Sequence, residues 1–402
     1  MACRPGGREE LADRRVAPVN RAIYARRVTV QTSAALRVPF IDLAPTNAVL
    51  KGRLLAEIGD LMDSGAFTNG PAVDEFELEF AEYCGVRECV GVASGLDALR
   101  LGLLAAGLRP GDGVVVPANT FVATVEAVVQ AGGVPLLVDV SESDYNIDVA
   151  AAACIRDARF ILPVHLYGQL ADMRAVSDLA ADRGITIVED ACQAHGAARE
   201  GIRGGTTGAC AAFSFYPAKN LGAMGDAGAL VTNDPALAEH VRALREHGQR
   251  MKYHHDIEGY TARLDTLQAL VLKHKLALLE EWNQERQAIA SFYGTALRGV
   301  GDLRLPPVPP GSIPVWHLYV VRTADHRELA SFLEEGGIAT GRHYPQPLHL
   351  SPAYARLGYV RGDFPVTEGL AEEILSLPIF PGMSRDQAEA VVARVRAYFD
   401  HA

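Results

Sequence analysis

Lys219 is the residue whose type and position point most clearly to chemistry. It lies between an aromatic run and a glycine-rich turn, in the stretch Ser214-Phe-Tyr-Pro-Ala-Lys219-Asn-Leu-Gly-Ala-Met-Gly225-Asp-Ala-Gly228. A lysine ammonium becomes a nucleophile only when desolvation or a nearby cation lowers its pKa, and apolar neighbours supply the first condition. Only five of the 38 basic residues are lysines. A lysine retained here, where arginine supplies most other positive charge, therefore indicates Schiff-base chemistry rather than a surface position.

A candidate carboxylate precedes this lysine by about thirty residues. Asp190 belongs to the run Val188-Glu189-Asp190-Ala-Cys-Gln193-Ala-His195-Gly196, directly after a predicted strand. A carboxylate at a strand end can pair with a protonated pyridine nitrogen, which keeps the ring an effective electron sink. The structural alternative for Asp190 is a helix N-cap. Gln193 and His195 either reach a ring oxygen or pack structurally, and for His195 both interpretations stay open.

Two further motifs are typical of a phosphate-bearing ring. The turn Ala93-Ser94-Gly95-Leu96-Asp97 opens a predicted helix, and backbone N–H groups at a helix start bind phosphate. Ser214 adds a hydroxyl to that anion site. Phe121 follows a predicted strand and can stack on a flat ring, whereas its structural alternative is an ordinary core phenylalanine. Together the four motifs are far more specific than any of them alone.

The elements that must position these residues follow an α/β pattern. Continuous apolar runs rich in Val, Ile and Leu predict buried strands. Amphipathic spacing predicts helices between them, including one that carries Phe76, Phe80 and Tyr83. The predicted strands are residues 113–117, 134–140, 160–165, 185–189 and 229–232, and the other helices residues 97–106 and 235–247. We therefore expect a mostly parallel sheet with the catalytic groups gathered where its strands end.

The second half of the chain predicts a smaller domain. A helical stretch over residues 262–297 precedes a segment, residues 303–314, that holds five prolines and marks a domain crossing. Beyond it we expect a strand (316–321), a helix (326–335), a strand (338–340) and a closing helix (385–398). The predicted organisation is an N-terminal extension (1–37), a large domain (38–290) and a small α+β domain (291–402). The extension holds eight arginines without a secretory signal's apolar core, so we interpret it as disordered or mis-started, with a transit peptide as the minority interpretation.

Composition excludes several classes of protein. The 402 residues carry a formal net charge of −11, and 49% of them are hydrophobic, as in a soluble globular protein. The longest apolar stretch, residues 114–140, is interrupted by polar residues and prolines, so no transmembrane helix is expected. Six cysteines without a C-x-x-C pair indicate neither a disulfide framework nor a metal site, and they suit the cytoplasm. The acidic balance makes nucleic acid an unlikely partner.

These motifs, in this order, resemble the sugar aminotransferases of the DegT/DnrJ/EryC/StrS family, which use pyridoxal phosphate on the aspartate aminotransferase fold (fold type I). The resemblance runs from Val38 to about Tyr398. Further strings that carry it are Tyr145-Asn-Ile-Asp148, Pro163-Val-His-Leu-Tyr-Gly168, Gly259-Tyr-Thr-Ala-Arg263-Leu-Asp265, Trp282-Asn283, His317-Leu-Tyr319, Thr340-Gly-Arg-His343-Tyr344-Pro345 and Leu375-Ser-Leu-Pro378. It implies a mostly parallel seven-stranded sheet flanked by helices and a smaller C-terminal α+β domain.

The resemblance also assigns roles to residues of the cofactor site. It makes Lys219 the lysine that binds the cofactor aldehyde and Asp190 the partner of the pyridine nitrogen. Gln193 contacts the ring oxygen and Phe121 stacks on the ring. Ser214 and the backbone of Gly95 and Leu96 hold the phosphate.

Two positions depart from the family pattern. Position 96 is often threonine, and Leu96 looks like the branch that acts on dTDP-linked 3-keto deoxyhexoses. At Thr261 the family usually has asparagine, which reaches the phosphate bound by the neighbouring subunit; threonine can also donate a hydrogen bond but is shorter. That contact is therefore open.

The expected substrate carries a diphosphate, so we expect positively charged side chains near the cleft. Arg263 is our candidate for binding the diphosphate. Further candidates in the family's variable and interface segments are Lys252, His254, His255 and Arg342. Each of these five residues has an equally good interpretation as a solvated side chain. His317, His343 and Tyr344 lie in motifs that resemble substrate-side loops.

The implied reaction takes an amino group from L-glutamate, leaves pyridoxamine phosphate as the half-reaction intermediate, and delivers the amine to a dTDP-linked keto sugar, at C3 by the Leu96 argument. A homodimer is implied, because fold type I sites are completed by a second subunit. The alternatives are a 4-keto sugar, a keto-cyclitol, synthesis of aminohydroxybenzoate, or a catalytically silent regulatory protein, which should have lost Lys219 or Asp190. A nicotinamide-dependent oxidoreductase lacks its G-x-G-x-x-G turn here.

Overall fold

The computed structural model describes residues 36–401. All but the last two residues of the predicted N-terminal extension lie outside that range. Within it, no helix is long and apolar enough to cross a membrane.

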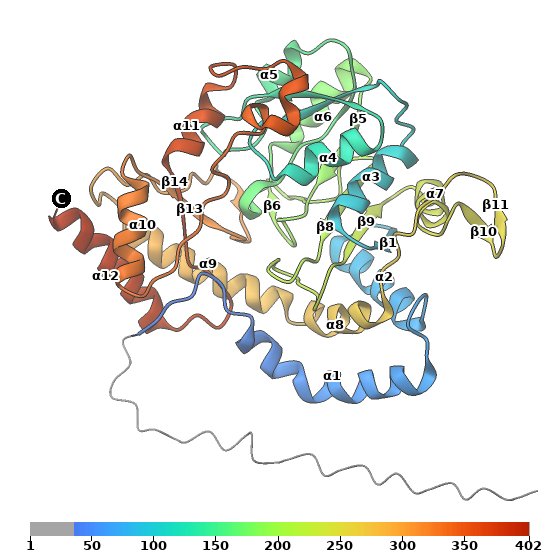
Figure 1. The fold of residues 1–402 in the computed structure, drawn as a ribbon, viewed down its shortest axis with the longest axis horizontal. Helices are drawn as coiled ribbons and strands as arrows, with labels where there is room; N and C mark the ends of the chain where they lie inside the picture. Colours follow the sequence, from blue (N-terminus) through green and yellow to red (C-terminus); the bar gives the residue numbers. More distant parts are fainter. Residues whose placement is uncertain (1–35, 402) are drawn as a thin grey trace, which may run out of the picture. The chain divides into compact units, whose positions relative to one another are not determined.

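A seven-stranded sheet forms the centre of the large α/β part (Figure 1), in the order β1-β9-β8-β5-β4-β2-β3. The strands are β1 (Glu88–Val92), β2 (Gly113–Pro117), β3 (Val134–Val138), β4 (Ala158–Ile161), β5 (Thr186–Asp190), β8 (Cys210–Ser214) and β9 (Gly228–Thr232). Strand β9 runs antiparallel to both of its neighbours, and the other pairs are parallel. The predicted mostly parallel seven-stranded sheet is therefore confirmed.

Helices cover both faces of this sheet, which explains why its strands are apolar on both sides. Val114 and Val116 of β2 join one core cluster together with α3 (Gly95–Ala105), α4 (Val122–Gln130) and α7 (Pro235–Arg245). Val115, between them, joins the opposite cluster with α5 (Val149–Cys154) and α6 (Met173–Arg183). Helices α2 (Pro71–Cys84) and α8 (Thr266–Leu276) pack over β8 and β9 on that second face. The alternation of side chains along each strand thus builds a three-layer arrangement.

The C-terminal part has a separate hydrophobic core. Strands β13 (Tyr319–Arg322) and β14 (Ile374–Leu377) pair antiparallel, and α9 (Leu279–Ala296), α10 (His326–Glu335) and α12 (Arg385–His401) pack against them. The predicted strand over residues 338–340 is wrong, since the chain there makes only isolated bridges, from Ile338 and Gly341. Ile338 bridges to Val38 and Gly341 to Ser376 of β14, so the segment changes partner within four residues and no continuous ladder forms. The predicted helical stretch 262–297 divides into α8 and α9, and the predicted domain boundary at residue 290 falls inside α9.

The remaining elements lie around these two cores. Helix α1 (Ala44–Ser64) lies alongside α8, and α11 (Pro365–Glu373) precedes β14. A hairpin of β10 (Gln249–Met251) and β11 (His254–His255) projects beyond α7 (Figure 1). Strands β12 (Ser312–Ile313), β6 (Ala198–Arg199) and β7 (Ile202–Arg203) form a small separate sheet.

Candidate active site

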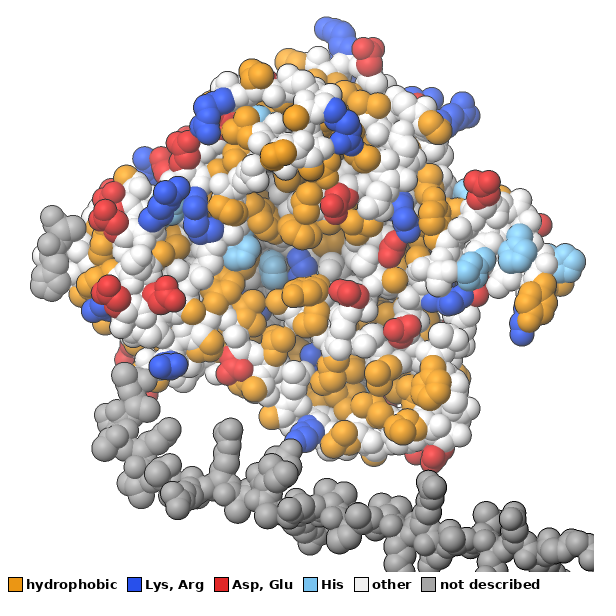
Figure 2. Space-filling model, viewed as in Figure 1, with side chains coloured by type: hydrophobic (Ala, Val, Ile, Leu, Met, Phe, Trp, Pro, Cys, Tyr) orange, Lys and Arg blue, Asp and Glu red, His pale blue; other side chains and the backbone are white. Residues whose placement is uncertain are grey.

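A cavity of about 420 Å³ opens where β5 and β8 end and α3 begins. Figure 2 shows a hollow in the middle of this face, with histidine and hydrophobic side chains around it. Ten residues predicted for the site line this cavity: Gly95, Leu96, Phe121, Asp190, Gln193, Ser214, Lys219, His317, His343 and Tyr344. These residues span some 250 positions of the chain, so the fold brings together what the sequence motifs only suggested.

The amine of Lys219 is available for reaction. Its side chain is partly buried in the cavity, and its Nζ makes no hydrogen bond to the described residues. Burial lowers the pKa of this amine, although Cys192 and Asp190 oppose the shift. A second buried lysine, Lys275, differs because its Nζ donates a 2.8 Å hydrogen bond to the carbonyl of Gly222. Lys219 therefore has both the lowered pKa and the unoccupied nitrogen that a nucleophile needs.

Asp190 lies at the carboxyl end of β5, where its carboxylate is buried and held at both oxygens. The Thr124 hydroxyl donates to Oδ2 at 2.7 Å, and the Cys192 amide donates to Oδ1 at 3.2 Å. Thr124 in turn shares a 2.8 Å hydrogen bond with Thr120. No helix begins after Asp190, so the N-cap alternative is wrong. A buried carboxylate without a cationic partner in the described residues suits a positively charged group bound in the cavity.

The start of α3 forms the phosphate end of the cavity. Ser94 caps the helix by accepting a 3.1 Å hydrogen bond from the Asp97 amide. A Cβ on Gly95 would lie 2.7 Å from both the Ser214 Cβ and the Cys192 Sγ, so only glycine allows this approach of the backbone. The N–H groups of the first turn thus lie beside the Ser214 hydroxyl, as an oxyanion site requires.

Phe121 is not a core residue, although the sequence left that alternative open. The residue is 49% exposed, and its ring packs directly against that of Tyr344, with a centroid distance of 5.5 Å, in the wall of the cavity. The residue immediately precedes α4, so the turn after β2 directs it outward. An exposed aromatic face lining a cavity is a stacking surface for a flat ring.

Gln193 connects the turn after β5 to the substrate-side loop. Its Oε1 accepts a 2.8 Å hydrogen bond from the Tyr167 amide, and its Nε2 donates to the Tyr344 hydroxyl at 3.1 Å. The Tyr167 hydroxyl donates to the carbonyl of His343. Both ends of the Gln193 amide are thus engaged in positioning the loop. Sequence reasoning assigned no role to Tyr167, since its partners lie far away in the chain.

Two neutral histidines border the cavity on the side of the C-terminal part. His317 Nδ1 lies 3.2 Å from Asn220 Oδ1, and burial together with Lys219 and Arg286 holds its pKa well below the usual range. His343 Nδ1 lies 2.8 Å from the Ser376 hydroxyl, and burial lowers its pKa to about 4. Both imidazoles are therefore uncharged at neutral pH, so they add hydrogen bonds without positive charge beside the lysine.

His195 has a structural role. Its ring packs against Phe213 and Phe215, its Nε2 donates to the Ser214 carbonyl at 3.0 Å, and it does not line the cavity. Burial lowers its pKa to about 3, so it stays neutral. Of the two interpretations left open by the sequence, the structure supports the packing one.

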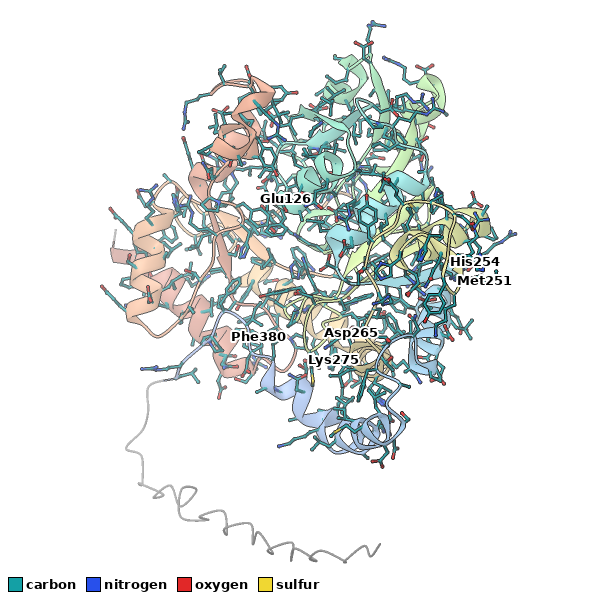
Figure 3. All side chains as sticks on the ribbon, turned by 45° about the vertical axis from the view of Figure 1, so that its right-hand side comes forward. Glu126, Met251, His254, Asp265, Lys275 and Phe380 are labelled. Atoms are coloured by element: carbon teal, nitrogen blue, oxygen red, sulfur yellow. The ribbon has the colours of Figure 1, made fainter. Side chains whose placement is uncertain are left out.

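Thr261 and Arg263 do not line the cavity of their own chain. The Thr261 hydroxyl lies 3.1 Å from the His247 ring, and Arg263 pairs with Glu246 at 2.7 Å. The nearby hairpin is exposed, and Met251 and His254 at its tip lie far from Phe380 of the C-terminal part (Figure 3).

The lining residues fit a flat phosphate-bearing aldehyde. The cavity lining holds an unpaired amine on Lys219, the Asp190 carboxylate held by Thr124 and the exposed ring of Phe121. It also holds backbone N–H groups at Gly95, where the absence of a side chain allows a close approach. Each group would suit one part of pyridoxal phosphate: the aldehyde, the pyridine nitrogen, the ring face and the phosphate, in that order. The described residues hold no cluster of three or more metal-ligating side chains.

Comparison with known proteins gives a consistent result. Residues 49–396 match the DegT/DnrJ/EryC1/StrS aminotransferase family. The chain is 47% identical over 364 residues to a Streptomyces venezuelae protein named dTDP-3-amino-3,4,6-trideoxy-alpha-D-glucose transaminase, covering 90% of this chain and 96% of that protein. It is 46% identical over 362 residues to the Saccharopolyspora erythraea protein named erythromycin biosynthesis sensory transduction protein EryC1, covering 90% and 99%.

The solved structures agree with the sequence comparison. The crystal structure of Streptomyces venezuelae DesV in complex with a ketimine intermediate superimposes with a TM-score of 0.89 at 46% identity, covering 91% of this chain and 99% of that one. A solved relative from Bacillus subtilis holds pyridoxamine phosphate. The family match over residues 49–396 includes every lining residue of the cavity except Phe40 and Ile41.

Proposed function

Because the chain belongs to the DegT/DnrJ/EryC1/StrS aminotransferase family, we propose that it transfers an amino group from L-glutamate to C3 of a dTDP-linked keto-deoxyhexose, in amino-sugar biosynthesis. The chain is a pyridoxal phosphate-dependent sugar aminotransferase. The observation that carries the proposal is the unpaired, partly buried amine of Lys219 in a cavity that also holds the braced carboxylate of Asp190.

The chain's own residues divide the work of the reaction. When bound, the cofactor supplies an electron sink for the carbanion formed at the carbon that loses its proton. Lys219 would bind the aldehyde through Nζ and then, released, carry the proton as general acid and base. Asp190 would hold the positive charge on the pyridine nitrogen, with Thr124 keeping its carboxylate in place. Ser214 and the backbone at Gly95 and Leu96 would anchor the phosphate, and Phe121 would exclude water from one ring face.

The choice of C3 rests on two observations. Leu96, the residue whose type resembles the 3-keto branch of the family, lines the cavity at the start of α3, and the Streptomyces venezuelae relative is named for a 3-amino sugar. His317, His343 and Tyr344 lie on the opposite side and are the residues we propose to contact the sugar. A 4-keto sugar is the competing substrate.

We also propose a homodimer that completes the cavity with residues from a second copy. Helix α1 exposes Val49, Leu55 and Met62, each more than half exposed, and α2 exposes Leu78 in the same way. Figure 2 shows hydrophobic side chains gathered toward the lower edge of the face shown. Exposed apolar side chains in such number are typical of a protein interface. Thr261, Arg263 and the hairpin cations Lys252, His254 and His255 would then reach the partner's cavity.

The reaction belongs in the cytoplasm on this proposal, as the cysteine pattern predicted. The five described cysteines are unpaired, and burial raises the pKa of Cys84, Cys89, Cys192 and Cys210, so their thiols are unreactive.

A catalytically silent regulatory protein is the second candidate. The name of the Saccharopolyspora erythraea relative includes sensory transduction, and that protein is 46% identical to this chain. The arrangement of Lys219 and Asp190 favours the enzyme, because a scaffold without catalysis has no need of an unpaired amine in its cavity.

The test is turnover with defined substrates. The purified protein, loaded with cofactor, is supplied with L-glutamate and either a dTDP-3-keto-6-deoxyhexose or a dTDP-4-keto-6-deoxyhexose, and products are identified by mass spectrometry. An amino sugar from the 3-keto compound supports the proposal; product from the 4-keto compound alone overturns the assignment to C3. Absence of product from both, with the cofactor bound, favours the regulatory candidate. The same assay is run on Lys219→Ala, which lacks the proposed reactive amine. Lys51→Ala serves as its matched control, because Lys51 is exposed.

A further inference from the structure

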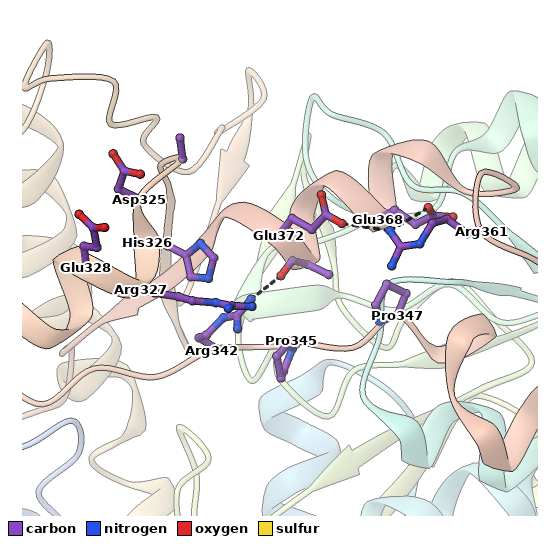
Figure 4. Close-up of a pocket in the computed structure, with 12 residues that line it drawn as sticks. Asp325, His326, Arg327, Glu328, Arg342, Pro345, Pro347, Arg361, Glu368 and Glu372 are labelled. Carbon is purple, nitrogen blue, oxygen red and sulfur yellow. Dashed lines mark hydrogen bonds and ion pairs between the residues drawn. The ribbon is translucent and has the colours of Figure 1, made fainter.

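A second cavity, of about 550 Å³, lies in the C-terminal part at the start of α10 and beside α11 (Figure 4). No residue lines both this cavity and the one that holds Lys219. The two are separated by residues 341–347: His343 and Tyr344 face the Lys219 cavity, whereas Arg342, Pro345 and Pro347 line the second. The second cavity is thus a distinct site on the other side of the substrate-side loop.

His326 lines this cavity with an unsatisfied ring. The residue is only 5% exposed, and neither of its ring nitrogens has a hydrogen-bond partner in the described residues. Burial, and then the Arg342 and Arg327 guanidiniums, lower the pKa of this imidazole, so it is neutral with one N–H and one bare nitrogen. A buried polar side chain without a partner costs stability unless something else supplies the hydrogen bond. The ring thus forms part of the cavity wall beside Arg327, and both of its nitrogens are shielded from the open space.

Two guanidiniums share the cavity without a counter-ion. Arg327 and Arg342 form no ion pair with a described carboxylate, and the pKa of Arg342 is lowered first by burial and then by the nearby Arg327 guanidinium. Arg342 donates to the carbonyl of Ala371, but its Nε is buried and unpaired. Two adjacent cations in a partly buried cavity repel each other, and an anion placed between them removes that cost.

The carboxylates around this cavity do not neutralise the pair. Glu372 pairs with Arg361 at 3.0 Å, and Glu368 accepts from the His349 ring at 2.9 Å and from the Gly362 amide. In Figure 4 Asp325 and Glu328 extend away from the two guanidiniums. The positive charge of Arg327 and Arg342 therefore faces the cavity.

We propose that this cavity binds the phosphate or diphosphate group of a small phosphorylated molecule, separately from the substrate in the Lys219 cavity. Guanidiniums form paired hydrogen bonds with phosphate oxygens, and Arg327 and Arg342 both line the cavity. The volume lies within the range of small-molecule sites, so a whole phosphorylated metabolite fits, not only an ion.

The test is calorimetric titration of the full-length holoenzyme with inorganic pyrophosphate, and with succinate as a carboxylate of similar charge. Arg327 is exposed at the first turn of α10, so Arg327→Ala is expected to fold. We expect this change to weaken pyrophosphate binding about tenfold or more, and to leave KM and kcat for the sugar unchanged. Arg156→Ala is the matched control, because Arg156 is exposed and lines neither cavity.

Three results would overturn the proposal. Unchanged pyrophosphate affinity in Arg327→Ala would show that the anion binds elsewhere, for example in the Lys219 cavity. Succinate binding as tightly as pyrophosphate would contradict a phosphate site. A crystal structure with pyrophosphate found only beside Lys219 would show that the second cavity is not used. None of these results bears on transaminase activity, which is measured independently on the same samples.

Discussion

The Thr124 hydroxyl donates a 2.7 Å hydrogen bond to the Asp190 carboxylate, joining the first turn of α4 to the end of β5. Thr124 is buried and receives support from Thr120 in the same turn. The carboxylate is thus oriented by a residue 66 positions away in the chain. On our proposal that this carboxylate meets the pyridine nitrogen in one orientation, Thr124 is a positioning residue for the reaction.

Replacing Thr124 with valine removes this hydrogen bond while keeping the shape of the side chain. A hydrogen bond to a charged group contributes about 1.5–3 kcal/mol, so we expect kcat to fall roughly tenfold or more with little change in the fold. The measurement is steady-state kinetics with circular dichroism as the fold check. Thr295→Val, on the exposed face of α9, is the control. Wild-type kcat in Thr124→Val would contradict the positioning role.

Asp190→Asn preserves the size of the side chain and removes its charge. We expect kcat to fall by about a hundredfold or more, because the ring nitrogen would no longer be held charged, while the cofactor remains bound. Cofactor content is measured by mass spectrometry under native conditions beside the kinetic assay. Full activity of the variant would show that the carboxylate does not tune the ring.

Gly95→Ala places a methyl group 2.7 Å from Ser214 and Cys192. The start of α3 must then shift, so we expect about 1–3 kcal/mol lower stability and weaker cofactor binding. Gly52→Ala is a matched control, because Gly52 lies in α1 with no atom within 4 Å of the added Cβ. That change should be neutral or slightly stabilising. Urea unfolding and cofactor titration of both variants distinguish the two effects.

Acid destabilisation should involve His343. Its pKa is lowered to about 4 in the folded chain, below the value of about 6.5 in an unfolded chain. Between these values the unfolded chain binds more protons, so stability is complete above about pH 6.5 and falls as the pH drops toward 4. His343→Gln should therefore lose less stability than the wild type between pH 7 and pH 5 in urea unfolding. An unchanged slope in that variant, with His254→Gln as the exposed control, would contradict the assignment.

The bounds of a strand were predicted best where its residue composition agrees with its burial in the sheet. The continuous apolar run of residues 113–117 matches β2 at both ends, because a strand buried on both faces needs no polar alternation. Strand β8, Cys210–Ser214, was not predicted, since its small residues give little strand signal and its burial is set by helices α3 and α8.

In the candidate site, too, the sequence predicts residues that belong to local motifs but not residues that act through distant contacts. Lys219 and Asp190 could be proposed from local motifs, because their chemistry needs particular residue types in a particular order, and both line one cavity. Thr124, Asn220 and Tyr167 act through partners that lie 66, 97 and 176 residues away, and no local pattern reveals such contacts. Their roles depend on the sheet order, which brings the ends of β2, β5 and β8 to one edge.

The most direct test of the account is to locate the covalent attachment of the cofactor. The holoenzyme is treated with borohydride, digested, and its peptides are analysed by mass spectrometry. The chain has five lysines, and Lys275 is a second buried amine whose pKa burial lowers to about 8, so the alternatives are few. We predict that the reduced cofactor is found on Lys219 and on no other lysine. Attachment at Lys275, or no attachment in a cofactor-containing sample, would contradict the assignment of Lys219 as the reactive amine.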